Sequence, residues 1–385
     1  MAAALPQELV DLILGELQTD EFDFLGRHTI ARCGLVCRNW LPLSRTHLFA
    51  HVILNDRSIK KLLSVVAASS FPILTFIRAV TLTVNAAQYK AFKTVFHQLG
   101  SLPQATTLRT SNLFTFAENS DFLSTHFPHI SVLVFRHKDA PFLEVLNAAS
   151  PFPSFKSLCL ESVGFPPLPH ESLASEPRIP PHWDSLTLGF MTHRDIENLF
   201  EALLSLDTIP ILSSLSIYSR KPKKHVDRLG SHLPPDFLEE NAFEFLQGYL
   251  CHIGSRLRHL KLESENAHSY IALPALEHNT GLESLALQFN YGPGTDILPT
   301  LLRVLSHLHA PRLSTVTVDV VSHVHPTIVP EEWHALDRAL ADECFEGLRT
   351  FTMRTPWAEL EEELPGHMPL SRARGILRVQ ARARW

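Results

Sequence analysis

The chain has 385 residues, of which 45% are hydrophobic and 19% charged, a composition typical of a globular protein with a substantial core. Its formal net charge of −6 argues against a dedicated nucleic-acid binder. The five cysteines are odd in number and widely scattered, so we predict no disulfide framework and a reducing compartment, cytoplasmic or nuclear. The longest uncharged run, residues 62–77, is shorter than the roughly 18–20 apolar residues that a spanning helix needs, so no membrane interaction is expected.

Residues 5–54 contain three short helical patterns. In the first, apolar residues recur at spacings of three and four, which predicts one apolar helical face formed by Leu5, Leu9, Leu12, Ile13 and Leu17. A second pattern runs from about residue 24 to 36, and a third starts near residue 39. Because roughly 40–60 residues form only a marginal core alone, we expect this module to complete its core against the next domain or a separate chain.

Two motifs in this stretch carry a resemblance to a known family. Residues 5–13 read Leu-Pro-x-Glu-Leu-x-x-x-Ile, and residues 35–40 read Leu-Val-Cys-Arg-x-Trp. Together they resemble the F-box, the three-helix motif by which substrate receptors of SCF-type ubiquitin ligases bind a Skp-type adaptor. The resemblance implies an F-box over residues 1–55. It also implies that the adaptor is contacted by Leu5, Pro6, Leu9, Ile13, Leu35, Val36, Cys37 and Trp40.

After Leu54 a strand-like frame, apolar-x-x-apolar-x-apolar, recurs along the chain. Clear copies lie at residues 77–85, 130–138, 155–163, 183–191, 212–220, 257–265, 282–290, 313–321 and 348–356. Weaker copies lie around Leu108 and at residues 375–379. Helical patterns separate several of the copies, at residues 89–100, 194–206, 242–253 and 331–345. The repeating unit is therefore predicted to be strand, turn, helix and turn.

The spacing between successive frames is mostly 25–35 residues, near the period of about 20–29 residues in leucine-rich repeats. Residues 56–385 therefore resemble an irregular leucine-rich-repeat solenoid, which implies parallel strands on a concave face and helices on a convex face. Stacked units of this kind share one continuous core. The alternative is a doubly wound α/β domain. Against it, the sequence has no glycine-rich strand-to-helix turn, and the repeat count is too high for one open sheet. The predicted fold class is thus α/β, a three-helix F-box followed by the solenoid.

Two charged segments interrupt or end the repeats. Residues 219–240 begin with a basic cluster that is typical of a nuclear signal or an anion patch, although a solvated loop is the favoured interpretation. At the C-terminus, five arginines accompany Leu377 and Val379, which alternate as in the earlier strands. The 26-residue spacing from Phe351 to Leu377 matches the repeat period, so we predict a final strand whose arginines discourage edge-to-edge pairing.

The sequence carries no catalytic motif that we could identify. It lacks a Gly-rich phosphate loop, a Gly-x-Ser-x-Gly nucleophile elbow and a His-Glu-x-x-His metal motif. His28, Cys33, Cys37 and His47 do not match a tetrahedral zinc spacing, and the two thiols fit a buried helical face better. We therefore expect no active site, cofactor or metal.

Strand alternation predicts a surface on which a partner could bind. If Leu260 and Leu262 point into the core, their neighbours point outward along the sheet. The larger outward side chains are the candidate target-binding residues: Tyr218, Lys261, Glu263, Asp319 and Arg354.

The two resemblances imply a substrate receptor that docks on the adaptor, and through it on a cullin ligase, and presents an unknown target protein through its repeats. Ubiquitin transfer would be accelerated by proximity alone. The alternative is a repeat-based scaffold in which the F-box-like segment only caps the solenoid. Neither nucleic acid nor a membrane is an expected partner.

Overall fold

The structure, a computed structural model, describes residues 5–17, 24–36, 39–69, 72–84, 86–111, 116–136, 142–165, 178–218, 244–264, 274–291, 297–322 and 329–381. In this part the chain is α/β, with thirteen α-helices and twelve parallel strands assigned to one sheet in chain order. It divides into two compact units. Unit 1 comprises Met1–His137, Leu143–Lys156 and Pro180–His182, and unit 2 comprises Lys138–Phe142, Ser157–Ile179 and Trp183–Trp385.

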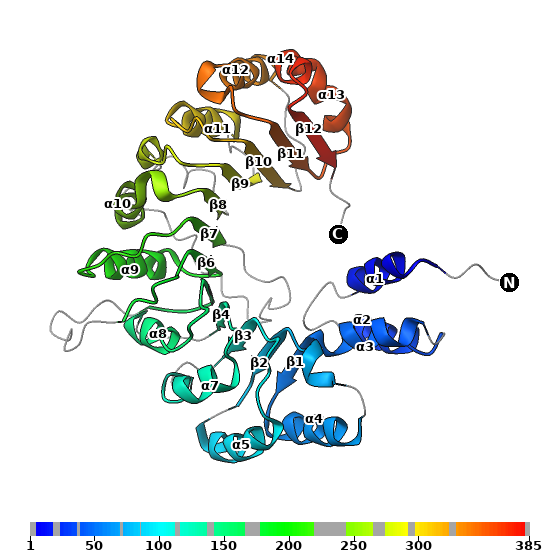
Figure 1. Cartoon of the computed structure of the whole chain (residues 1–385). Coiled ribbons are helices and arrows are strands. Elements are labelled where there is room, and N and C mark those ends of the chain that lie inside the picture. Colours follow the sequence, from blue (N-terminus) through cyan, green and yellow to red (C-terminus); the bar gives the residue numbers. More distant parts are fainter. Residues whose placement is uncertain are drawn as a thin grey trace, which may run out of the picture. The chain divides into compact units, whose positions relative to one another are not determined.

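Unit 1 begins with three helices and continues as alternating strands and helices (Figure 1). The first three helices are α1 (Gln7–Glu16), α2 (Phe24–Cys33) and α3 (Trp40–Ala50). The strands are β1 (His51–Leu54), β2 (Ala79–Leu82), β3 (Thr107–Thr110) and β4 (Val132–Phe135). The elements between or after them are α4 (Asp56–Ala68), the 3₁₀ turn η1 (Ile73–Phe76), α5 (Ala86–Leu99), α7 (Ser120–His126) and α8 (Phe142–Ala149).

Unit 2 contains the longer part of the repeat. Its strands are β5 (Ser157–Glu161), β6 (Ser185–Gly189), β7 (Ser214–Tyr218), β8 (His259–Ser264), β9 (Ser284–Tyr291), β10 (Thr315–Ser322), β11 (Thr350–Thr355) and β12 (Leu377–Ala381). Its α-helices are α9 (His193–Leu204), α10 (Glu244–Ile253), α11 (Ile297–Ser306), α12 (Pro330–Leu340), α13 (Glu359–His367) and α14 (Pro369–Ala373). Three 3₁₀ turns complete it, η2 (Gly254–Arg256), η4 (Pro274–His278) and η5 (Glu343–Phe345). Helices α9 to α13 lie along one side of these strands (Figure 1).

The core of unit 2 is built from columns of equivalent residues on successive strands. The parallel register aligns Leu186, Leu215, Leu260, Leu285, Val316 and Phe351, and each is at most 1% exposed. A second column two residues further along each strand is also buried, for example Leu287, Val318 and Met353. The residues between the columns point to the opposite face because side chains alternate along a strand. The predicted inward direction of the frame leucines is therefore confirmed.

Every strand-like copy of the frame forms a strand, including the weak copies at Leu108 and at residues 375–379. The final strand pairs with β11 through the predicted match of Phe351 with Leu377. The four predicted helical patterns correspond to α5, α9, α10 and α12. One strand, β1, was not predicted, because its four residues follow α3 directly and carry no turn signal before them. The charged segment 219–240 lies outside the described residues.

Local caps explain why some helices begin where they do. The hydroxyl of Thr192 accepts from the Asp195 amide at 3.2 Å, and the Asp195 carboxylate accepts from the Thr192 amide at 3.2 Å. This reciprocal capping box satisfies amides at the start of α9 that have no partner within the helix. Asn55 and Ser58 form a second box that starts α4.

Gly281 allows two successive strand–helix repeats within unit 2 to approach each other closely. A Cβ atom built on it would lie 1.8 Å from the carbonyl oxygen of Ser255 in η2. Gly281→Ala is therefore expected to destabilise unit 2 by about 1–3 kcal/mol, because the backbone of one of these two repeats must move. Gly366→Ala is the matched control, since no atom lies within 4 Å of the added Cβ and the residue is helical. Equal unfolding midpoints in urea for the two variants would show that this close approach is not needed.

Candidate functional site

The N-terminal helices have a small core of their own. Val10 and Leu14 from α1 meet Ile30 from α2, and all three are at most 2% exposed. Partly buried side chains pack against this centre, namely Leu17, Cys33, Trp40, Leu43 and Leu48. The core is small, as expected for so few residues. Cys33 belongs to it, in keeping with its interpretation as a helix-core thiol.

The same helices expose an unusual amount of apolar surface. We call it the N-terminal apolar surface, and it consists of Leu5 (50% exposed), Leu9 (46%), Leu12 (64%), Ile13 (40%), Leu35 (83%) and Val36 (67%). These six are more than half of the ten exposed large apolar side chains in the described part of the chain. Single exposed apolar residues are normal, but six within one short part of the chain are a candidate for an interaction surface.

The predicted adaptor-binding residues fall into three groups. Leu5, Leu9, Ile13, Leu35 and Val36 belong to the N-terminal apolar surface, and Pro6, which precedes α1, is exposed beside them. Trp40 is half-buried and packs against the inner core. Cys37 lies outside the described residues. Leu12, which the two motifs do not assign to the adaptor, is also exposed and shares the apolar spacing of Leu5 and Leu9.

Polar contacts fix the three helices to each other and to the first strand. Nε2 of His47 on α3 lies 2.8 Å from Oδ1 of Asp11 on α1. The guanidinium of Arg27 on α2 donates a hydrogen bond to the backbone carbonyl of His51, the first residue of β1. The His51 ring in turn lies 2.8 Å from the Thr81 hydroxyl on β2. These contacts couple the helices to the sheet of unit 1.

His51 gives this junction a pH dependence. Burial, reinforced by the positive charges of Arg27 and Arg136, lowers the pKa of His51 to about 4, below the usual value of about 6.5. Between these two values the unfolded chain binds the proton and the folded chain does not, so stability falls as pH drops from about 6.5 toward 4. His51→Gln is expected to flatten this part of the stability profile.

The measurement is the thermal unfolding midpoint as a function of pH. His252→Gln on α10 is the matched control, because that side chain is exposed. The control should keep the wild-type slope between about pH 4 and 6.5. An unchanged slope in the His51 variant would contradict the role given to this histidine.

The target-binding candidates lie in unit 2, on the sheet face opposite the helices. Tyr218, Lys261 and Glu263 are brought together there on β7 and β8. Nζ of Lys261 lies 2.9 Å from Oε1 of Glu263, donates to the Tyr218 hydroxyl at 3.4 Å and sits 4.4 Å from the centre of the Tyr218 ring. We call these three residues the tyrosine cluster.

The positive charge of Lys261 in the tyrosine cluster is paired with the carboxylate of Glu263. Burial by itself would lower the pKa of Lys261, but the hydrogen bond and charge of Glu263, together with Tyr218, raise it above its usual value. The lysine therefore stays charged and is held in place by its neighbours. A fixed aromatic ring next to a neutralised ion pair is suited to contacting another protein, since tyrosine is enriched among residues that dominate interfaces.

The other two target-binding candidates are not equally accessible. Glu263, Gln288, Asp319 and Arg354 occupy equivalent register positions on β8 to β11. Asp319 is only 8% exposed, between the buried Gln288 and Arg354, so it is a poor anchor for a partner. Arg354 is exposed, and its Nε donates to the Gln380 side chain at 3.4 Å.

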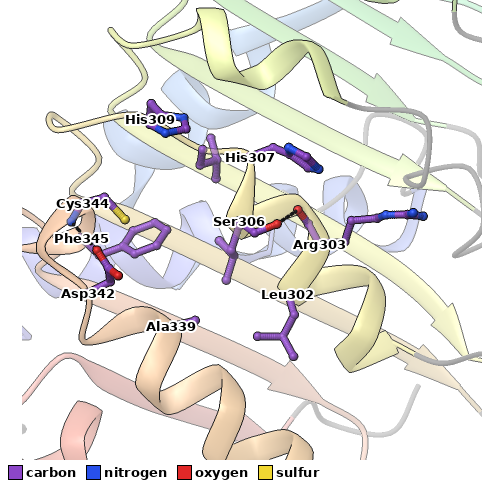
Figure 2. Close-up of a pocket in the computed structure, with 11 residues that line it drawn as sticks. Leu302, Arg303, Ser306, His307, His309, Ala339, Asp342, Cys344 and Phe345 are labelled. Carbon is purple, nitrogen blue, oxygen red and sulfur yellow. Dashed lines mark hydrogen bonds between the residues drawn. The ribbon is translucent and has the colours of Figure 1, made fainter.

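The cavity shown in Figure 2 lies between the end of α11 and η5, with a volume of about 730 Å³. It contains the thiol of Cys344, whose backbone amide donates to the Asp342 carboxylate at 3.1 Å. Burial, with the hydrogen bond and charge of Asp342, raises the pKa of Cys344, which keeps the thiol protonated and weakens it as a nucleophile.

The described residues contain no group of three His, Cys, Asp or Glu side chains placed to hold a metal ion.

Comparison with known proteins adds no family to these observations. No protein-family model matches the sequence, and no curated protein matches it either. Within the described residues, none of the helices is both long and apolar enough to cross a bilayer.

Proposed function

We propose that the chain is the substrate-recognition subunit of an SCF-type ubiquitin ligase. In this proposal α1 to α3 are an F-box that binds a Skp-type adaptor, and through it a cullin. The observation that carries the proposal is the N-terminal apolar surface, most of which consists of residues that the F-box motifs assign to the adaptor. Covering a half-exposed leucine contributes about 1 kcal/mol, so six such residues supply a substantial driving force.

The target protein would bind to the repeats, on the sheet face opposite the helices of unit 2. Two features support this part. The accessible positions are mostly small, such as Ser216, Thr317 and Ala286, which leaves room for a partner to lie close to the strands. The tyrosine cluster lies on the same face and is held by the contacts of Lys261 with Glu263 and Tyr218.

The second candidate is a scaffold in which the N-terminal helices only cap the sheet. It is favoured by one observation, that α3 packs against η1 and β1 while Arg27 bonds to the carbonyl of His51. A cap of this kind does not account for the exposed side of α1, because a cap needs a polar outer surface.

The test is co-expression of the full chain with a Skp-type adaptor and a cullin, followed by gel filtration. The ligase proposal expects a single complex that contains all three proteins in equal amounts. The scaffold alternative expects the chain to elute without the adaptor. A folded chain that never retains the adaptor would remove the ligase proposal.

A further inference from the structure

The sheet of unit 2 ends with an incompletely covered core layer. β12 pairs with β11 on one side and, among the described strands, has no neighbour on the other. Leu377 and Val379 occupy the two buried columns of the sheet, in which the preceding residues Phe351 and Met353 are 0% and 1% exposed. Both β12 residues are nevertheless only half-buried. One more strand would cover them.

The backbone at this edge is oriented to accept such a strand. The Phe351 amide donates to the Ile376 carbonyl at 2.8 Å, so that carbonyl points toward β11, whereas the Ile376 amide donates to the Ser371 carbonyl at 3.1 Å. Because alternate residues of a strand direct their backbone groups to the same side, the N–H and C=O groups of Arg378 and Gln380 also point toward β11. The N–H and C=O groups of Leu377, Val379 and Ala381 therefore point to the free edge, which is a template for pairing.

A groove of about 620 Å³ follows this edge. It is lined by the four consecutive strand residues 377–380, whose side chains alternate between the two faces of the sheet. Its helix side is formed by Pro365 with Glu361 and Glu362 of α13 and by Arg372 of α14. The path along the edge is thus open to an extended segment.

The two sides of the edge select different residues. On the helix side, Leu377 and Val379 favour apolar side chains. The two carboxylates of Glu361 and Glu362 outnumber the one positive charge of Arg372, so further acids are disfavoured there. On the opposite side Arg378 is exposed, and an acidic residue placed beside it on an added strand forms a favourable cross-strand pair. A second copy of β12 offers no acidic partner to Arg378, because the residues of that strand on this side are Arg378 and Gln380.

We propose that the free edge of β12 binds an extended segment of another protein as an additional strand, with apolar and acidic residues alternating along it. Main-chain hydrogen bonds to Val379 and its edge-facing neighbours supply affinity, and Arg378 selects the acidic partner. The inference stands independently of the adaptor proposal, because none of its residues belongs to the N-terminal helices.

The test uses the full chain and two fluorescein-labelled peptides, one alternating Val with Glu and one alternating Val with Lys, in an anisotropy titration. We expect the Glu peptide to bind and the Lys peptide to bind about fivefold more weakly. Arg378→Glu should reverse this order. Arg303→Glu, a charge reversal of an exposed arginine on α11, should leave the order unchanged. An order that Arg378→Glu does not alter would overturn the proposed selection.

The backbone contribution is tested with Val379→Pro. This change removes an amide that points to the free edge and leaves the bonds to β11 in place, as proline on an edge strand allows. Peptide binding should be lost while the unfolding temperature stays close to that of the wild type. A Glu peptide N-methylated at alternate residues must also fail to bind, which tests pairing without changing the protein. Strand addition would be excluded if Val379→Pro bound the Glu peptide as tightly as the wild type does. It would also be excluded if the wild type bound the N-methylated peptide as tightly as the unmodified one. Wild-type self-association that Val379→Pro abolishes would make a second copy the occupant and contradict the proposal.

Discussion

Replacing both Leu9 and Ile13 with Asp is expected to abolish binding of a Skp-type adaptor while both units stay folded. Each side chain is almost half exposed in the free chain, so a carboxylate there remains in water and costs little stability. In the proposed complex the same carboxylates would be buried without a partner, which costs about 2–5 kcal/mol. The expected loss of affinity is at least about 100-fold.

Val65→Asp is the matched control for this experiment. Val65 lies on α4 and is 44% exposed, close to the values for Leu9 and Ile13, but it is not part of the N-terminal apolar surface. The control should bind the adaptor as the wild type does. A well-folded double variant that binds the adaptor with unchanged affinity, measured by calorimetry, would argue for the scaffold alternative.

Truncation of Leu260 to Ala is expected to lower the free energy of unfolding of unit 2 by about 2–5 kcal/mol. Leu260 is 1% exposed and lies in the first buried column, between Leu215 on β7 and Leu285 on β9. The shared core gives the cavity no space to collapse without moving the neighbouring strands. The unfolding midpoint in urea measures the loss.

Lys261→Ala is the internal control because it changes the adjacent residue of the same strand. Its side chain points to the opposite face and is 42% exposed. Its ion pair with Glu263 is only partly exposed, since the Glu263 side chain is 13% exposed, and losing the pair should cost about 1 kcal/mol, less than the truncation of Leu260. Equal losses for the two truncations would contradict the alternation of buried and outward residues on which the target-binding surface depends.

The repeat was predictable from sequence because its signal is physical and recurs. Each strand must place a large apolar residue in both columns, so the frame around Leu186, Leu215 and Leu260 marks the strand, its inward face and its register together. The same reasoning found β12 from the alternation of Leu377 and Val379 and from the 26-residue spacing between Phe351 and Leu377. β1 was missed because a four-residue strand directly after a helix has too few positions to reveal a period of two.

The candidate site was less predictable because the exposure of a side chain depends on which other elements pack against it. The apolar face expected for α1 included Leu5, Leu9 and Leu12, yet the module builds its own core from Val10 and Leu14. Spacing alone could not tell these two adjacent stripes apart. For similar reasons alternation placed Asp319 on the correct face of its strand but could not show that neighbouring side chains bury it. The hydrogen bond from Arg27 to His51 joins residues 24 positions apart and leaves no local signature.

The proposed ligase role requires that a Skp-type adaptor cover the exposed side of α1 and the turn after α2. Hydrogen–deuterium exchange of the full chain, with and without a stoichiometric amount of purified adaptor, tests it most directly. We expect slower exchange in residues 5–17 and 34–36 when the adaptor is present, with little change at β7 and β8. Exchange that is unaltered over residues 5–36, or that slows only in the strands of unit 2, would contradict it.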